Sequence, residues 1–138
     1  MAEVLKRVEA EVREERVQNY GMRLILSQPP RTHCEEMRRK LNWMTLKKRR
    51  VMARLCMMHR CVLKEYSVKS LSKRIQFNSN GTRGVGKLFL PRPQTDFFKN
   101  SFTFKGIQDW NRLQSDVRTT IKINYNTFRK HLRTATAG

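Results

Sequence analysis

The sequence has little that would anchor it in a membrane or cross-link it outside the cell. No apolar run approaches the roughly 18 residues needed to cross a bilayer. The N-terminus, charged from Glu3 onward, lacks the apolar core of a secretory signal. The three cysteines are an odd number and form no Cys-x-x-Cys pair, so they do not suggest a disulfide framework. We therefore expect an intracellular protein, nuclear or cytoplasmic, with reduced thiols.

Acidic residues are also scarce, which argues against several kinds of catalysis. After Glu65 the only acids are Asp96, Asp109 and Asp116, each isolated, whereas a two-metal polymerase or nuclease needs carboxylates close together. The segment NGTRGVG at 80–86 lacks the Lys-Ser pattern of a phosphate-binding loop. We predict that the chain is not an enzyme, has no catalytic residues and needs no cofactor.

Cysteine and histidine, the usual ligands of structural zinc, occur at His33, Cys34, Cys56, His59 and Cys61. Their spacing does not match a zinc site, because Cys56 and Cys61 are more than one helical turn apart. We predict no metal site, and interpret the cysteines as buried thiols and His59 as a partly exposed side chain.

Positive charge is what the chain has in abundance. Its 30 Lys and Arg residues outnumber 11 Asp and Glu, which gives a formal net charge of +19. Five of the acids precede Arg16, whereas the segment from Arg38 to Lys64 contains no acid. Such a density of charge repels itself unless an anion lies against it, and a phosphate backbone is the commonest partner.

The basic segment has the pattern of an amphipathic helix. Helical spacing between Leu41 and Tyr66 groups apolar residues on one face and basic residues on the other. Thr45 can cap the start, and we expect the helix to end near Tyr66. The apolar face comprises Val51, Met52, Leu55, Met58, Val62 and Leu63. Because so small a domain needs this face for its core, we expect no binding to a membrane surface.

The remaining pattern predicts a mainly α fold, a small helical domain with a basic irregular loop or a short β-hairpin. The loop covers 67–93 and should be exposed, with 74–77 and 87–90 as the possible hairpin strands around a turn at Asn80 and Gly81. We expect a charged N-terminal helix at 1–17, a helical module at 18–133 and a disordered tail at 134–138. The second half of the core should come from large apolar residues: Phe97, Phe98, Phe102, Phe104, Ile107, Trp110 and Leu113. We also expect a short helix that starts after Thr32 or His33 and runs to about Leu41. A final helix should start at Asn126 or Thr127 and set Phe128 against Leu132, with Arg129, Lys130 and Arg133 outward. Trp43 is expected in the core as well.

Several short motifs, in this order, resemble the segment downstream of the polymerase domain in LINE-like (non-LTR) retrotransposon reverse transcriptases of the jockey and Rex kind. The resemblance covers about residues 18 to 133. The motifs are Gln18-Asn19, Met22-Arg23, Ile25, Pro30-Arg31-Thr32, LNWMTLKKRR at 41–50, Met57-Met58, Thr82-Arg83, Leu90-Pro91-Arg92, Ser101-Phe102, Trp110-Asn111-Arg112-Leu113, Val117-Arg118, Phe128-Arg129-Lys130 and Leu132.

The resemblance implies a non-catalytic module that contacts RNA or DNA, because the polymerase palm with its paired aspartates and the endonuclease are absent from the sequence. The chain would then be a fragment or a remnant of such an element, with a polymerase domain as a further partner. Two departures stand out: Gln114 occupies the position of a family proline, and residues before Arg16 match nothing expected.

Independently of the resemblance, the basic residues themselves predict phosphate contacts. Arginine offers directional donors to phosphate oxygens and lysine a less directional charge. The predicted contacts are Lys47, Lys48, Arg49, Arg50, Arg54, Arg60, Lys64 and Arg83. The alternative hypothesis is a protein-interaction module that docks on a polymerase domain or on itself, with the positive charge serving only solubility.

Overall fold

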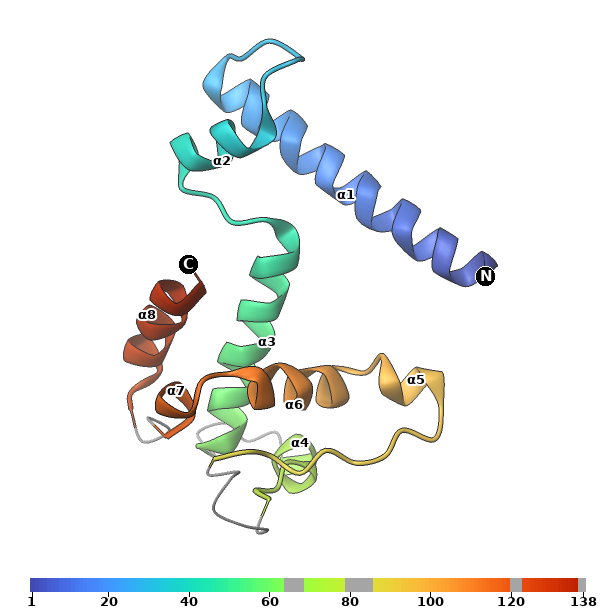
Figure 1. The fold of residues 1–138 in the computed structure, drawn as a ribbon, viewed down its shortest axis with the longest axis vertical. Helices are drawn as coiled ribbons and strands as arrows, with labels where there is room; N and C mark the ends of the chain where they lie inside the picture. The colour runs from blue at the N-terminus through green and yellow to red at the C-terminus, as the bar shows by residue number, and fades with distance from the viewer. Residues whose placement is uncertain (64–68, 79–85, 120–122, 137–138) are drawn as a thin grey trace. The chain divides into compact units, whose positions relative to one another are not determined.

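The computed structural model describes residues 1–63, 69–78, 86–119 and 123–136 (Figure 1). Within these ranges the chain is 72% helix and contains no strand, which confirms the predicted mainly α-helical fold. The helices are α1 (Ala2–Leu26), α2 (Cys34–Leu41), α3 (Leu46–Val62), α4 (Lys69–Arg74), α5 (Asp96–Lys99), α6 (Phe102–Arg112), α7 (Ser115–Thr119) and α8 (Tyr125–Thr136). The chain separates into two compact units, Met1–Arg49 and Arg50–Gly138.

In the first unit α1 is longer than expected. It runs without a break through the predicted division after residue 17 and ends at Leu26, because the apolar set from Tyr20 onward continues the same helical pattern. Ser27 then adopts a left-handed conformation (φ 50°), and its N–H donates to the carbonyls of the last turn. Met22 of α1 and Met37 of α2 are fully buried and form the small core of this unit.

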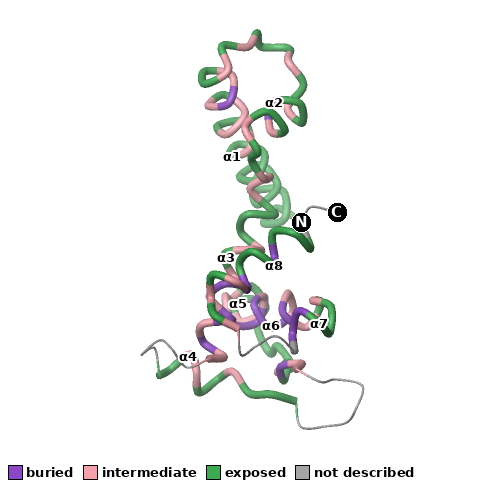
Figure 2. The backbone as a smooth tube through the Cα atoms, turned by 90° about the vertical axis from the view of Figure 1, so that its left-hand side faces the viewer, coloured by how far each residue is buried: buried purple, intermediate pink, exposed green. Residues whose placement is uncertain are grey.

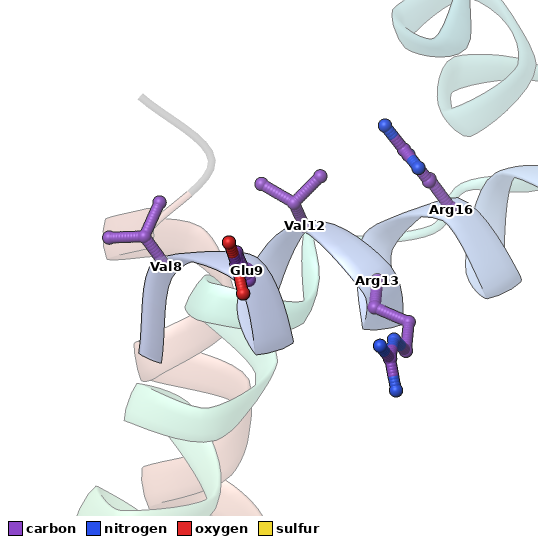
Figure 3. Close-up of a pocket in the computed structure, with 5 residues that line it drawn as sticks. All are labelled: Val8, Glu9, Val12, Arg13 and Arg16. Atoms are coloured by element: carbon purple, nitrogen blue, oxygen red, sulfur yellow. The ribbon is translucent and has the colours of Figure 1, made fainter. Parts of the chain in front are cut away.

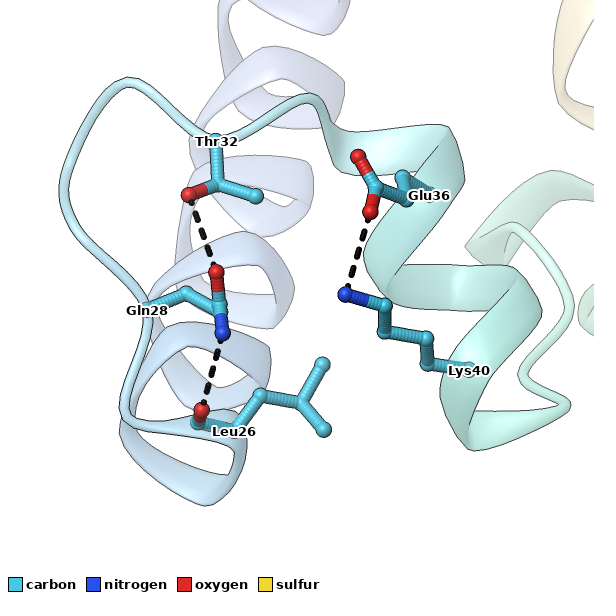
Figure 4. Close-up of polar contacts among 5 residues, drawn as sticks. All are labelled: Leu26, Gln28, Thr32, Glu36 and Lys40. Atoms are coloured by element: carbon cyan, nitrogen blue, oxygen red, sulfur yellow. Dashed lines mark hydrogen bonds and ion pairs between the residues drawn. The ribbon is translucent and has the colours of Figure 1, made fainter.

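The connection from α1 to α2 is held by side-chain hydrogen bonds (Figure 4). The Gln28 amide nitrogen donates to the Leu26 carbonyl at 3.3 Å, and the Thr32 hydroxyl donates to the Gln28 amide oxygen at 3.5 Å. On α2, Lys40 pairs with Glu36 at 3.0 Å, and this hydrogen bond and charge lower the pKa of the Glu36 carboxyl. The predicted short helix ending at Leu41 is confirmed.

The predicted cap of the central helix is also confirmed. The Thr45 hydroxyl accepts from the Lys48 N–H at 3.3 Å, and α3 begins at the next residue. The helix ends at Val62, earlier than the predicted Tyr66, and residues 64–68 lie outside the described ranges. Its buried residues are Leu55, Cys56, Met58, His59 and Cys61.

His59 corrects the sequence analysis, which expected it partly exposed. Its side chain is fully buried, and its ring stacks on Phe128 of α8 with 4.1 Å between ring centroids and 12° between planes. The ring of Trp110 on α6 also stacks on Phe128, with 5.8 Å between ring centroids. Figure 2 shows these buried segments of α3, α6 and α8 together in the second unit. The His59 imidazole, stacked on the Phe128 ring, is therefore part of the core.

Most of the predicted aromatic and aliphatic core is confirmed. Phe104, Ile107, Trp110, Phe128 and Leu132 are each at most 4% exposed. The start of α6 is fixed by Ser101, whose hydroxyl accepts from the Phe104 N–H at 3.3 Å.

Two large rings expected in the core are exposed. Phe97 is 90% exposed, because neighbouring helical residues face different ways and Phe98 takes the inward position, edge-on to Phe104 at 5.8 Å. Trp43 is 36% exposed in the short connection before α3, where the Arg49 guanidinium lies 5.8 Å from its ring.

The stretch predicted as an irregular exposed loop is more ordered than expected. It contains α4 and an isolated antiparallel bridge between Phe77 and Leu88. The bridge is closed by Asn78 N–H to the Lys87 carbonyl (2.9 Å) and Phe89 N–H to the Gln76 carbonyl (2.7 Å). This bridge joins the two segments predicted as hairpin strands, 74–77 and 87–90, although neither forms a strand. The turn predicted at Asn80 and Gly81 lies outside the described residues.

The C-terminal helix is also longer than predicted. It begins at Tyr125 rather than Asn126 or Thr127, with the Asn124 side chain accepting from the Asn126 N–H at 2.9 Å. It continues through Thr136, into the range predicted as a disordered tail, and the Thr134 hydroxyl donates to the His131 carbonyl at 2.8 Å. Residues 137–138 lie outside the described ranges.

Candidate nucleic-acid interface

The first turn of α3 concentrates positive charge at the wrong end of a helix. Lys47, Lys48, Arg49 and Arg50 follow the cap, all are exposed, and no acid lies in the turn. Cations near the positive end of the helix dipole are unfavourable by about 0.3 to 1 kcal/mol each at low salt. An anion bound against this turn would relieve that cost.

Arg54 has a different surrounding. Its Nε donates to a carboxylate oxygen of Asp109 on α6 at 2.7 Å, and the two side chains are 26% and 11% exposed. This ion pair ties α3 to α6 within the second unit. The Arg54 guanidinium, which was predicted to contact phosphate, therefore already has a carboxylate partner. We expect Arg54 to contribute more to stability than to phosphate binding.

Farther along α3, Arg60 meets the C-terminal helix, which lies beside α3 (Figure 1). Its guanidinium sits 3.9 Å from the centroid of the Tyr125 ring, a cation–π contact that holds the charge in one orientation. Tyr125 also hydrogen-bonds the Cys56 side chain. The position of Arg60 is thus set by the packing between α3 and α8.

Two further arginines, Arg129 and Arg133 of α8, act on the same cysteine as Tyr125. Burial raises the pKa of the Cys56 thiol, and against it act the Tyr125 hydrogen bond and the positive charges of Arg129, Arg60 and Arg133. The charges of three arginines on two helices therefore act on one buried thiol. We call Arg60, Arg129 and Arg133 the α3–α8 basic surface.

The α3–α8 basic surface is built by the spacing of α8. Phe128 and Leu132, four residues apart, are fully buried, so Arg129 and Arg133, also four apart, share an adjoining exposed face. Neither α3 nor α8 contains an aspartate or glutamate. The two helices therefore contribute only positively charged side chains to this surface.

Sequence reasoning identified Arg60 but not Arg129 or Arg133 as part of a site. The outward direction of both follows from the Phe128 and Leu132 spacing, but nothing in the sequence brings α8 next to α3. The remaining predicted contacts, Lys64 and Arg83, lie outside the described residues and stay predictions.

Residues 1–63, 69–78, 86–119 and 123–136 contain no group of three His, Cys, Asp or Glu side chains arranged to hold a metal ion. Cys56 and Cys61 are buried free thiols, and burial raises the pKa of Cys61 as well. No helix in these ranges is long and apolar enough to span a membrane.

Comparison with known proteins gives no match. No protein-family model fits the sequence, and neither a curated protein nor a solved structure is similar to it.

Proposed function

We propose that this chain is a non-catalytic nucleic-acid-binding module that contacts the phosphates of RNA or DNA, of the kind found downstream of the polymerase domain in LINE-like reverse transcriptases. The observation that carries the proposal is the α3–α8 basic surface, whose three arginines come from two acid-free helices and all act electrostatically on Cys56. The family assignment rests on the sequence motifs alone.

Arginine is suited to this role because its planar guanidinium can donate two hydrogen bonds to one phosphate. Arg60 is held over Tyr125, and Arg129 and Arg133 project from one rigid helix. Less side-chain freedom is lost on binding when the donors are already oriented. The α3–α8 basic surface therefore suits a repeated anion better than the same charges on flexible segments would.

The first turn of α3 supplies a second set of contacts, from Lys47, Lys48, Arg49 and Arg50. A phosphate there would meet both the side chains and the N-terminal end of the helix. Contacts of this kind fix a backbone in position without reading its sequence. We therefore propose binding that is weakly sequence-specific, with base selection left to an attached or associated polymerase domain.

A charge-matched pair of variants tests the proposal. The first changes Arg60, Arg129 and Arg133 to Gln; the second changes Lys6, Arg7 and Arg13 of α1 to Gln, so both lose the same charge. Binding to a fluorescent single-stranded RNA and a DNA duplex is followed by anisotropy, with helix content checked by circular dichroism. We expect about tenfold or greater loss of affinity in the first and a much smaller loss in the second. Equal losses would reject the α3–α8 basic surface as the site.

A further inference from the structure

The N-terminal half of α1 exposes an apolar stripe. Leu5, Val8 and Val12 are 59%, 51% and 45% exposed. In Figure 3 the side chains of Val8 and Val12 project from the same side of the helix as Arg16, while Arg13 points to the opposite side. Together with Glu9 these residues line a shallow groove along the helix. This face is apolar at its centre and charged along its borders.

The stripe belongs to a regular seven-residue pattern. Steps of three and four residues lead from Leu5 to Val8, Val12, Glu15, Asn19, Met22 and Leu26, the spacing of the a and d positions in a coiled coil. Glu15 and Asn19 are the polar members and separate an N-terminal from a C-terminal apolar part. At the C-terminal end of α1 this seam is covered, since Met22 is fully buried and Leu26 half-buried where α1 packs on α2. The N-terminal end of the same seam is uncovered.

The distribution of charge along the chain indicates which partner could cover the exposed apolar residues of α1. The first 17 residues contain four basic and five acidic residues and are nearly neutral, whereas the rest of the chain contains 26 basic and six acidic residues. Two copies of the chain would repel each other strongly through the rest but not through this segment. The segment is therefore the part of the molecule best able to meet its own copy.

We propose that the N-terminal half of α1 pairs with the same segment of a second copy as a parallel, in-register, two-stranded coiled coil. Leu5 and Val12 take a positions and Val8 a d position. Glu11 is then a g residue and Arg16 the e residue five positions later, so each Glu11 faces the partner's Arg16 across the seam. The proposed contacts all lie in the first unit, and the inference does not depend on nucleic-acid binding.

Sedimentation equilibrium of the nuclease-treated full chain tests this pairing. We expect a reversible monomer–dimer equilibrium that strengthens as salt is raised, because salt screens repulsion between the basic parts more than it affects apolar contact. The double variant Val8→Gln, Val12→Gln should weaken dimerisation by about tenfold or more. Val17→Gln is the matched control: Val17 is 69% exposed and lies off the seam, so its dimerisation constant should equal that of wild type.

Charge exchange tests the register separately. Glu11→Arg and Arg16→Glu should each weaken the dimer, because each places like charges opposite one another, and the two together should restore it. A chain that stays monomeric at every concentration and salt, or a dimer that the Val8 and Val12 substitutions leave unchanged, would overturn the proposal. An assembly larger than two copies would overturn the two-stranded form.

Discussion

The carboxamide of Asn111 holds the backbone of Leu88 at both its polar groups. Its oxygen accepts from the Leu88 N–H at 2.8 Å, and its nitrogen donates to the Leu88 carbonyl at 2.9 Å. Next to it, the Trp110 indole N–H donates to the Gly86 carbonyl at 3.0 Å. These hydrogen bonds attach the segment around Leu88 to α6. The segment has one β-bridge, to Phe77, and no partner strand among the described residues. The Leu88 side chain is buried in the core.

Removing the Asn111 amide should therefore destabilise the second unit. Asn111→Ala leaves one backbone donor and one acceptor of Leu88 without partners, at a cost of about 2 to 4 kcal/mol in the free energy of unfolding. Urea denaturation followed by circular dichroism measures this loss. The neighbouring exposed Arg112 provides the control, and Arg112→Ala should change stability by less than about 0.5 kcal/mol. Similar effects of the two substitutions would show that the Asn111 hydrogen bonds contribute little.

Two helical glycines should respond oppositely to alanine. A Cβ at Gly21 meets nothing within 4 Å, so Gly21→Ala should stabilise α1 by about 0.5 to 1 kcal/mol. A Cβ at Gly106 would lie 2.8 Å from Met58 Sδ and 2.9 Å from its Cγ, and Met58 is fully buried. The resulting overpacking, about 1 to 3 kcal/mol, should outweigh the gain in helix propensity. Urea midpoints of the two variants, compared with that of wild type, test both expectations. Stabilisation by Gly106→Ala would contradict the close packing of α3 on α6.

Arg54 should affect stability more than nucleic-acid binding. Arg54→Gln removes the ion pair with the partly buried Asp109, and we expect a loss of about 1 to 3 kcal/mol. If the folded variant is compared with wild type, the dependence of RNA affinity on salt should be nearly unchanged. A clear fall in that dependence would return Arg54 to the set of phosphate contacts.

Stability should fall at alkaline pH because of the buried thiols. Burial raises the pKa of Cys56 and of Cys61, so the folded chain keeps these protons to higher pH than the unfolded chain. The stabilisation is complete below the thiols' ordinary pKa and is lost as pH rises through the raised values. Urea midpoints at about pH 7.5 and about pH 9.5 should therefore differ less in a Cys56→Ala, Cys61→Ala double variant than in wild type. Equal differences would exclude the thiols as the cause.

Local signals in the sequence predicted much of the fold. The hydroxyl of Thr45 gave the start of α3, and the spacing of Phe128 and Leu132 gave the buried face of α8; both are confirmed. The failures are tertiary. Whether His59 is buried depends on the ring of Phe128, which is far away in the sequence.

The candidate site shows the same division. An acid-free basic segment can be recognised from composition, and it contains Arg60. The pairing of Arg54 with Asp109, 55 residues apart, and the joint action of Arg60 and Arg129 on Cys56 require the packed helices. Charge patterning therefore identified the segment but could not show which of its arginines form ion pairs within the fold.

The most direct test of nucleic-acid binding is the salt dependence of affinity. The logarithm of the binding constant for a single-stranded RNA and for a DNA duplex is plotted against the logarithm of salt concentration, for wild type and for the variant with Gln at Arg60, Arg129 and Arg133. Each lost phosphate contact lowers the slope by about 0.7 on single strands and about 0.9 on duplex, so we predict a slope smaller by about 2 to 3 in magnitude. Identical slopes, or no binding by wild type at low salt, would contradict the account.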